Sequence, residues 1–178
     1  MEGEEVGITS SYIIKTPLGL LRAVFSEKGL KSLSLVPQEQ GSDFSGLYDN
    51  EGGERLAALK TYINDHFYGR DPGRRDIELD MEGVSPFRER VYKALMEVPF
   101  GEVVTYGELA DRAGCPGGAR AVGNAMNSNP YLLIVPCHRV VASGSGRGKS
   151  GLGGFGAGLD AKRFLLRLEG HQDDINGL

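Results

Sequence analysis

Cysteine, histidine and arginine follow one another at Cys137, His138 and Arg139, and these residue types can perform nucleophilic chemistry. A free thiol has a pKa of about 8.5, so only a few per cent of it is thiolate at neutral pH. A neighbouring imidazole or guanidinium would favour the thiolate or accept its proton, which makes Cys137 a candidate nucleophile. A lone buried cysteine is more commonly a small apolar core residue. Because neighbours in sequence need not meet as side chains, the spacing alone leaves both interpretations open.

The glycine-dense segment 144–158 contains two patterns that resemble nucleotide-binding motifs but lack their context. Residues 143–150 (SGSGRGKS) lack the first glycine of a phosphate-binding loop, and the glycines after them cannot begin the required helix. Residues 151–156 match G-x-G-x-x-G, yet no strand precedes them directly. A loop that closes over a ligand or a backbone is the simpler interpretation.

The remaining cysteine and the histidines do not predict a metal site. Neither cysteine belongs to a C-x-x-C pair, and no two histidines have the spacing of metal ligands. We therefore expect no metal and no cofactor, and interpret Cys115 as a structural residue in a turn.

The charge of the chain is distributed unevenly. Its 178 residues carry 20 Lys+Arg and 24 Asp+Glu, and the net charge of −4 argues weakly against binding nucleic acid. Residues 1–85 have a net charge of −6 and residues 86–178 of +2, while residues 112–167 carry eight bases against Asp160 alone. This net charge of +7 indicates either a nucleic-acid surface or a solvated basic face.

The first half of the chain has the pattern of a small α+β unit. Short aliphatic and β-branched segments separated by turn residues predict three strands, at 11–15, 20–26 and 30–36. Residues 54–67 predict an amphipathic helix, and 77–79 a further short strand. No residue of this half suggests chemistry.

The second half predicts short, sharply bounded helices. Ser85 and Pro86 begin a helix that runs to about Glu97, and Thr105 and Glu108 form a capping box. Helices at 106–113 and 118–128, joined by a Gly/Pro turn, have the form of a helix-turn-helix. An apolar run at 131–135 predicts a buried strand that leads to Cys137, and 159–169 predicts a last helix with Leu159, Leu165 and Leu168 on its apolar side.

The helix at 118–128 has an unusual composition, with small residues at every second position from Ala119 to Ala125. Such side chains let a backbone approach another surface closely, or pack tightly in a core, and both interpretations stay open. No apolar run reaches the ~20 residues of a membrane span, and the N-terminus lacks a signal-peptide pattern. We expect a reduced, monomeric cytoplasmic protein, or a nuclear one in a eukaryote, without a membrane partner.

Several motifs, in order, closely resemble the O6-alkylguanine-DNA alkyltransferases, also called methylated-DNA–protein-cysteine methyltransferases. They are residues 101–110 (GEVVTYGELA), 119–126 (ARAVGNAM), 129–130 (NP) and 136–141 (PCHRVV). The resemblance implies an α+β protein, with a ribonuclease-H-like domain at 1–84 and a DNA-binding alkyltransferase domain at 85–178. The latter would contain a winged-helix-like helix-turn-helix. The implied partner is double-stranded DNA that contains O6-alkylguanine.

The resemblance also implies a mechanism. Cys137 would attack the alkyl carbon, His138 would take the thiol proton through a water, and Glu169 would orient the imidazole. Tyr106 would assist nucleotide flipping and hydrogen-bond to the extruded guanine. The product is a thioether, so each molecule would act once, on O6-alkylguanine, with O4-alkylthymine as a second candidate substrate.

Further residues acquire roles through the same resemblance. Arg120 would fill the space that the flipped nucleotide leaves in the duplex. The small residues that would approach the minor groove are Ala119, Ala121, Gly123 and Ala125. The residues that would form the substrate pocket are Met126, Asn129, Val140, Phe155 and Gly156.

The chain departs from the family pattern at three points. Phe155 stands where many members have tyrosine, the loop before it is about five residues longer, and the zinc ligands of some N-terminal domains are absent. One alternative is an alkyltransferase-like protein that binds the lesion without repairing it, although such proteins replace the nucleophile. An unrelated Cys-His hydrolase is another, but it leaves Arg120 and the small-residue helix unexplained.

Overall fold

The computed structural model describes residues 10–37, 53–73, 77–143 and 151–171. The strands are β1 (Ser10–Thr16), β2 (Gly19–Ser26), β3 (Gly29–Leu35), β4 (Val104–Thr105) and β5 (Val140–Val141). The α-helices are α1 (Gly53–Phe67), α2 (Pro86–Met96), α3 (Tyr106–Arg112), α4 (Ala119–Asn127) and α5 (Leu159–Leu168), and η2 (Cys137–Arg139) is a 3₁₀ turn. The expected α+β class is confirmed.

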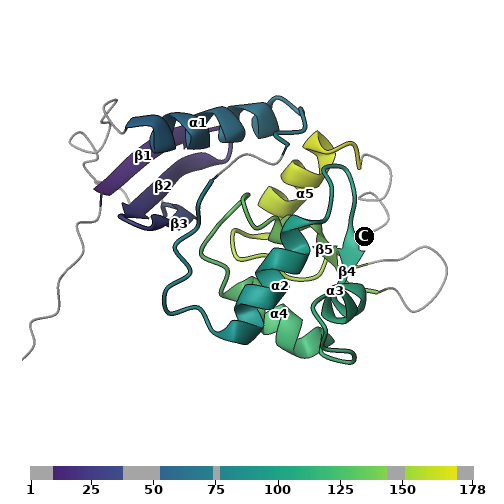
Figure 1. Ribbon diagram of the computed structural model, residues 1–178. Helices are drawn as coiled ribbons and strands as arrows, with labels where there is room; N and C mark the ends of the chain where they lie inside the picture. Colours follow the sequence, from purple (N-terminus) through teal and green to yellow (C-terminus); the bar gives the residue numbers. More distant parts are fainter. Residues whose placement is uncertain (1–9, 38–52, 74–76, 144–150, 172–178) are drawn as a thin grey trace, which may run out of the picture.

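The first half forms an antiparallel sheet covered by one helix (Figure 1). The three strands pair in the order β1-β2-β3, so the predicted meander is correct to within a residue or two at each end. Helix α1 turns Leu56, Leu59 and Ile63 into the core, as its apolar spacing predicts. The predicted strand at 77–79 is wrong: Leu79 makes a single bridge to Leu30, because this segment pairs only with the edge strand β3.

The predicted helix ends of the second half are confirmed. The Ser85 side chain accepts a hydrogen bond from the Arg88 amide at the start of α2. Thr105 and Glu108 form both bonds of the capping box at the start of α3. The turn between α3 and α4 is tight, because a Cβ on Gly118 would lie 2.7 Å from the carbonyl oxygen of Cys115.

The predicted strand at 131–135 is wrong, and Cys137 therefore does not lie at the end of a strand. This segment is a turn, with Leu133 in the left-handed region at φ 70° and a single bridge between Tyr131 and Leu33. The Asn129 side chain closes the turn, since its Nδ2 donates to the Val135 carbonyl and its Oδ1 accepts from the backbone amide of Tyr131. A short apolar run indicates burial, but burial alone does not distinguish a strand from a folded loop.

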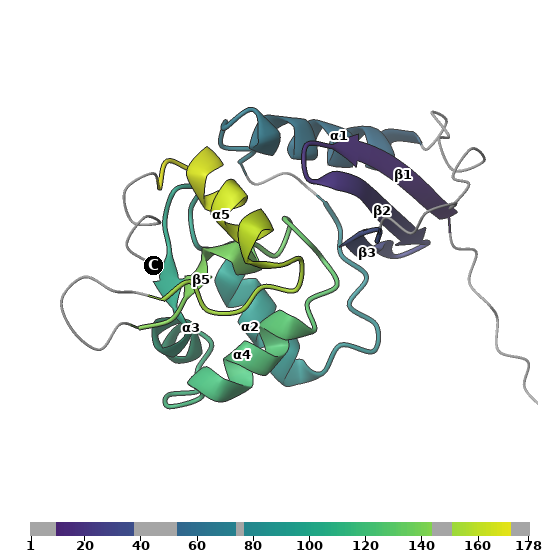
Figure 2. The ribbon, with the colours of Figure 1, turned by 180° about the vertical axis from the view of Figure 1, so that it is seen from behind.

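Helix α5 joins the two halves of the molecule. It contacts both α1 and η2, and Figure 2 shows it beside α1 in the view from behind. Its first residue, Leu159, is 43% exposed, so the prediction that Leu159 lies on the buried side is wrong. That side is formed by Lys162, Leu165 and Leu166. Within the described residues, no helix is long and apolar enough to span a membrane.

Among the six bases of residues 112–167 that the structure describes, two are internal. Arg139 is 5% exposed and forms an ion pair with Glu169, and Lys162 is fully buried. Arg147 and Lys149 lie outside the described residues. The surface of this stretch is therefore less basic than the net charge of +7 indicates.

Candidate active site

Cys137 begins the η2 turn and is buried, with 7% of its surface exposed. Its Sγ accepts a hydrogen bond from the side-chain nitrogen Nδ2 of Asn129 at 3.3 Å. The same Nδ2 donates to the Val135 carbonyl at 2.8 Å. Asn129 thus fixes the position of the sulfur relative to the turn that carries it.

The thiol of Cys137 is held in its protonated form. Burial raises its pKa, and the hydrogen bond from Asn129 and the charge of Lys162 only partly oppose this effect. The expectation that the Arg139 guanidinium would favour the thiolate is wrong, because that guanidinium binds Glu169 and the Val98 carbonyl. Chemistry at Cys137 therefore requires a base to remove the proton.

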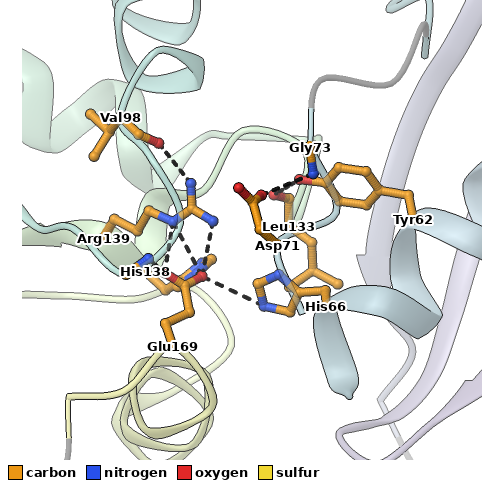
Figure 3. Close-up of polar contacts among 10 residues, drawn as sticks. Tyr62, His66, Asp71, Gly73, Val98, Leu133, His138, Arg139 and Glu169 are labelled. Carbon is orange, nitrogen blue, oxygen red and sulfur yellow. Dashed lines mark hydrogen bonds and ion pairs between the residues drawn. The ribbon is translucent and has the colours of Figure 1, made fainter. Parts of the chain in front are cut away.

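His138, which follows Cys137 in the η2 turn, forms a buried pair with Glu169 (Figure 3). Nε2 of His138 lies 2.7 Å from Oε1 of Glu169, and both side chains are fully buried. Burial lowers the pKa of His138, although the carboxylate of Glu169 opposes the shift, so the ring is neutral at neutral pH. Its Nδ1 has no hydrogen-bond partner among the described residues. A neutral imidazole bound through Nε2 offers Nδ1 as a proton acceptor.

Glu169 is ionised despite its burial. Burial opposes ionisation, but the hydrogen bonds and charges of His138 and Arg139 outweigh it and lower the pKa of Glu169 to about 2. Arg139 donates to both carboxylate oxygens, through Nε at 2.9 Å to Oε2 and through Nη2 at 3.0 Å to Oε1. The Gly101 amide donates to Oε2 at 3.1 Å. These donors hold the carboxylate in the orientation that receives His138.

A small cavity of about 40 Å³ opens beside the sulfur of Cys137. Tyr106, at the start of α3, closes one side, and its hydroxyl donates to the Gly154 carbonyl at 3.5 Å. Burial raises the pKa of this hydroxyl, so it remains a donor at neutral pH. The cavity is lined by Tyr106, Gly123, Met126, Asn127, Cys137, Gly154, Phe155 and Gly156.

The predicted pocket residues fall into two groups. Met126, Phe155 and Gly156 line this cavity, and Asn129 bonds the sulfur directly. Val140 does not line it, and its carbonyl accepts a hydrogen bond from Lys162 at 2.5 Å. A second cavity of about 220 Å³ extends to Leu33–Leu35 of β3 and shares five lining residues with the first: Met126, Asn127, Cys137, Phe155 and Gly156.

Helix α4 presents only part of its small-residue series to the surface. Arg120 and Ala121 are exposed, and Ala119 and Gly123 are half-buried. Ala125 is 1% exposed, with its carbonyl accepting from the Tyr92 hydroxyl, so its predicted direct contact with DNA is wrong for this structure. Residues two apart on a helix differ by about 200°, so an alternating series does not form one face.

Only one group of potential metal ligands occurs in the part of the chain that the structure describes. His66, His138 and Glu169 place one donor atom each within 4.8 Å of one another. Arg139 already binds both oxygens of that carboxylate. A metal ion would therefore meet a guanidinium charge at its own ligand, which disfavours binding.

Comparison with known proteins places the chain in a family. Residues 86–171 match the model of the 6-O-methylguanine DNA methyltransferase DNA-binding domain. A methylated-DNA–protein-cysteine methyltransferase of Mycobacterium bovis is 52% identical over 156 residues, which cover 88% of this chain and 89% of that protein. This chain belongs to the methylated-DNA–protein-cysteine methyltransferase family. The predicted resemblance is thereby confirmed.

Other members of the methyltransferase family agree over a similar length. The methyltransferase of Methanosarcina acetivorans is 37% identical over 159 residues, which cover 89% of this chain and 96% of that protein. The crystal structure of Mycobacterium tuberculosis OGT in complex with DNA superposes with a TM-score of 0.74 at 35% identity. That match covers 93% of this chain and 97% of the other.

Sequence reasoning missed three residues of this candidate site. Asn127 lines both cavities, and Gly153 and Lys162 shape the loop beside them. Lys162 donates to the carbonyls of Val140, Leu152 and Gly154. The sequence could have indicated its burial, because Lys162 lies on the apolar side of the last helix. The charge count instead included it among the surface bases.

Proposed function

We propose that this protein repairs DNA by transferring the alkyl group of O6-alkylguanine irreversibly to its own Cys137. The observation that carries the proposal is the arrangement around the sulfur: a buried thiol, fixed by Asn129 and followed by a neutral histidine paired with a carboxylate. A sulfur–carbon bond forms as the carbon–oxygen bond of the lesion breaks, and guanine leaves with that electron pair. The thioether cannot be hydrolysed by a neighbouring base, so each molecule acts once.

In this mechanism His138 is the general base and Glu169 its positioning partner. The free Nδ1 of His138 receives the thiol proton through a water, while Nε2 remains bonded to Glu169. The ionised Glu169 stabilises the imidazolium that forms. Guanine leaves as an anion and takes up a proton, and the proton released by the imidazolium balances it, so His138 returns to its neutral form.

Tyr106 and the loop around Phe155 would complete the pocket. The Tyr106 hydroxyl is a donor whose current acceptor, the Gly154 carbonyl, lies 3.5 Å away and is easily exchanged for an atom of guanine. The Phe155 ring lies edge-to-face with His138 at 6.4 Å and offers an apolar surface for the base. Phe155 and Gly156 line both the cavity of about 40 Å³ and the second one of about 220 Å³, so this loop borders the space that the base would enter.

Helix α4 supplies the proposed DNA contact. Arg120 is exposed near its start, where it can replace a flipped nucleotide in the duplex. Ala119, Ala121 and Gly123 leave the backbone accessible, and Ala125 supports the helix from the core side. We assign DNA binding and chemistry to residues 85–178 and an N-terminal domain to 1–84, acting as a monomer in the compartment that contains DNA, the cytoplasm or a nucleus.

The proposal is tested by stoichiometry. Protein is titrated into a duplex with one O6-methylguanine, and the remaining lesion is measured after completion. One lesion should disappear per protein molecule, with none removed by Cys137→Ser. Catalytic turnover beyond one lesion contradicts the single-use mechanism, and tight lesion binding without repair favours the alternative of a non-catalytic lesion-binding protein.

A further inference from the structure

A second histidine lies against the proposed catalytic pair, and no step of the mechanism uses it. His66 lies in the last turn of α1, and its side chain is fully buried (Figure 3). Its Nε2 is 3.8 Å from Oε1 of Glu169, the same oxygen that His138 binds at 2.7 Å. The two imidazole rings meet edge-to-face at 5.4 Å. The first half of the chain thus reaches the centre of the site.

The surroundings of His66 hold it neutral and leave its nitrogens without partners. Both nitrogens are buried and have no hydrogen-bond partner among the described residues. Burial lowers its pKa to about 3, with further lowering by His138 and Arg139 against the opposing charge of Glu169. The rings of Phe67 and Phe100 also pack against it edge-to-face. An apolar ring would fill this space without the cost of an unpaired buried N–H.

We propose that His66 is a positioning residue that directs its Nε2–H at Oε1 of Glu169 and thereby keeps His138 available as a base. The inference rests on the proposed function. A movement of about 1 Å brings the 3.8 Å separation to hydrogen-bond length. The ring also forms one wall against His138, which limits rotation of the base.

The effect on His138 follows from the charges that face it. Protonated His138 is stabilised by the carboxylate of Glu169 and destabilised by Arg139 and Lys162. A hydrogen bond from His66 to Oε1 weakens the attraction between that oxygen and a protonated His138. It also places the positive end of the N–H dipole near His138. Both effects disfavour the imidazolium, so His138 stays neutral, and able to accept the thiol proton, to a lower pH.

The test compares two substitutions at one position. His66→Phe keeps a buried ring without a nitrogen, whereas His66→Gln keeps an N–H donor at a similar distance along the side chain. The rate of methyl transfer to protein is measured against pH under single-turnover conditions. In the profile of rate against pH, His66→Phe should move the acidic limb to higher pH by roughly half a unit, which lowers the rate on that limb about threefold. The rate on the plateau should stay unchanged. His66→Gln should keep the wild-type profile.

Tyr62→Phe is the matched control for packing between the two halves. Tyr62 lies one turn earlier on α1, and its hydroxyl donates to the Leu133 carbonyl at 3.4 Å without touching Glu169. Its profile should match wild type. The inference is overturned if His66→Phe also matches wild type, or if Tyr62→Phe shifts the limb equally. Absence of transfer by wild-type protein would instead reject the proposed function.

A measurement on wild-type protein decides the question if His66→Phe does not fold. Nitrogen NMR of the histidine rings reports which nitrogen of His66 carries the proton. The proposal requires the proton on Nε2, and a proton on Nδ1 overturns it.

Discussion

Gly153→Ala tests whether the position of Tyr106 controls alkyl transfer. Gly153 has φ +67°, and a Cβ there would lie 2.8 Å from both Cε2 and the hydroxyl oxygen of Tyr106. Alanine in the left-handed region costs about 1–2 kcal/mol of stability. It must in addition displace the ring or the loop by several tenths of an ångström or more. A displacement of about 1 Å at a reacting site can reduce the rate about 100-fold.

Gly83→Ala provides the control for backbone strain. Gly83 has φ +81°, and a Cβ added there would have no other atom within 4 Å, so the substitution adds strain without a clash. Urea unfolding should show a loss of about 1–2 kcal/mol for Gly83→Ala and at least that loss for Gly153→Ala. Single-turnover methyl transfer should be slowed on the order of 10- to 100-fold by Gly153→Ala alone. Equal transfer rates for the two variants would refute the assigned role of Tyr106.

Three further predictions concern charge. Arg139→Met removes the partner of a buried carboxylate and should cost about 3–5 kcal/mol in urea unfolding, whereas a loss below about 1 kcal/mol would show that the pair is not stabilising. As pH falls from 7 to 5, the unfolded chain protonates His66 while the native state, with a pKa of about 3, does not. The free energy of unfolding should therefore fall by about 2 kcal/mol more in wild type than in His66→Phe, and equal losses would contradict the lowered pKa. Because Arg139 and Lys162 are internal, the slope of log binding constant against log salt concentration should be shallower than about −6 for wild-type protein, and a steeper slope would contradict this expectation. Arg120→Ala should lose much of the preference for damaged DNA.

Local signals in the sequence predicted the elements well. The side chains of Ser85 and Thr105 bond to groups three residues later in the chain, so their capping effect is encoded within four residues. The stripe of α1 follows from helical period in the same way. The segment at 131–135 was different, because its fold depends on the Asn129 side chain and on pairing with β3, about a hundred residues earlier.

The site was predicted through motif resemblance more than through physical reasoning. His138 and Glu169 do lie together, directly after Cys137 in the case of His138, but the partner of Arg139 required knowing that α5 ends beside η2. Lys162 and His66 carry no local sign of their positions, since a lysine or histidine in an amphipathic helix is ordinarily solvated. Their burial results from contacts between segments distant in sequence, which a single sequence does not display.

In the proposed function, Cys137 is the final acceptor of the alkyl group. Protein incubated with a duplex containing O6-methylguanine is digested, and its peptides are weighed by mass spectrometry. The peptide carrying Cys137 should gain one methyl group in place of one hydrogen, with no gain at Cys115 and none in Cys137→Ser protein. An unmodified Cys137 peptide after the lesion has disappeared, or a gain that persists in Cys137→Ser, would contradict it.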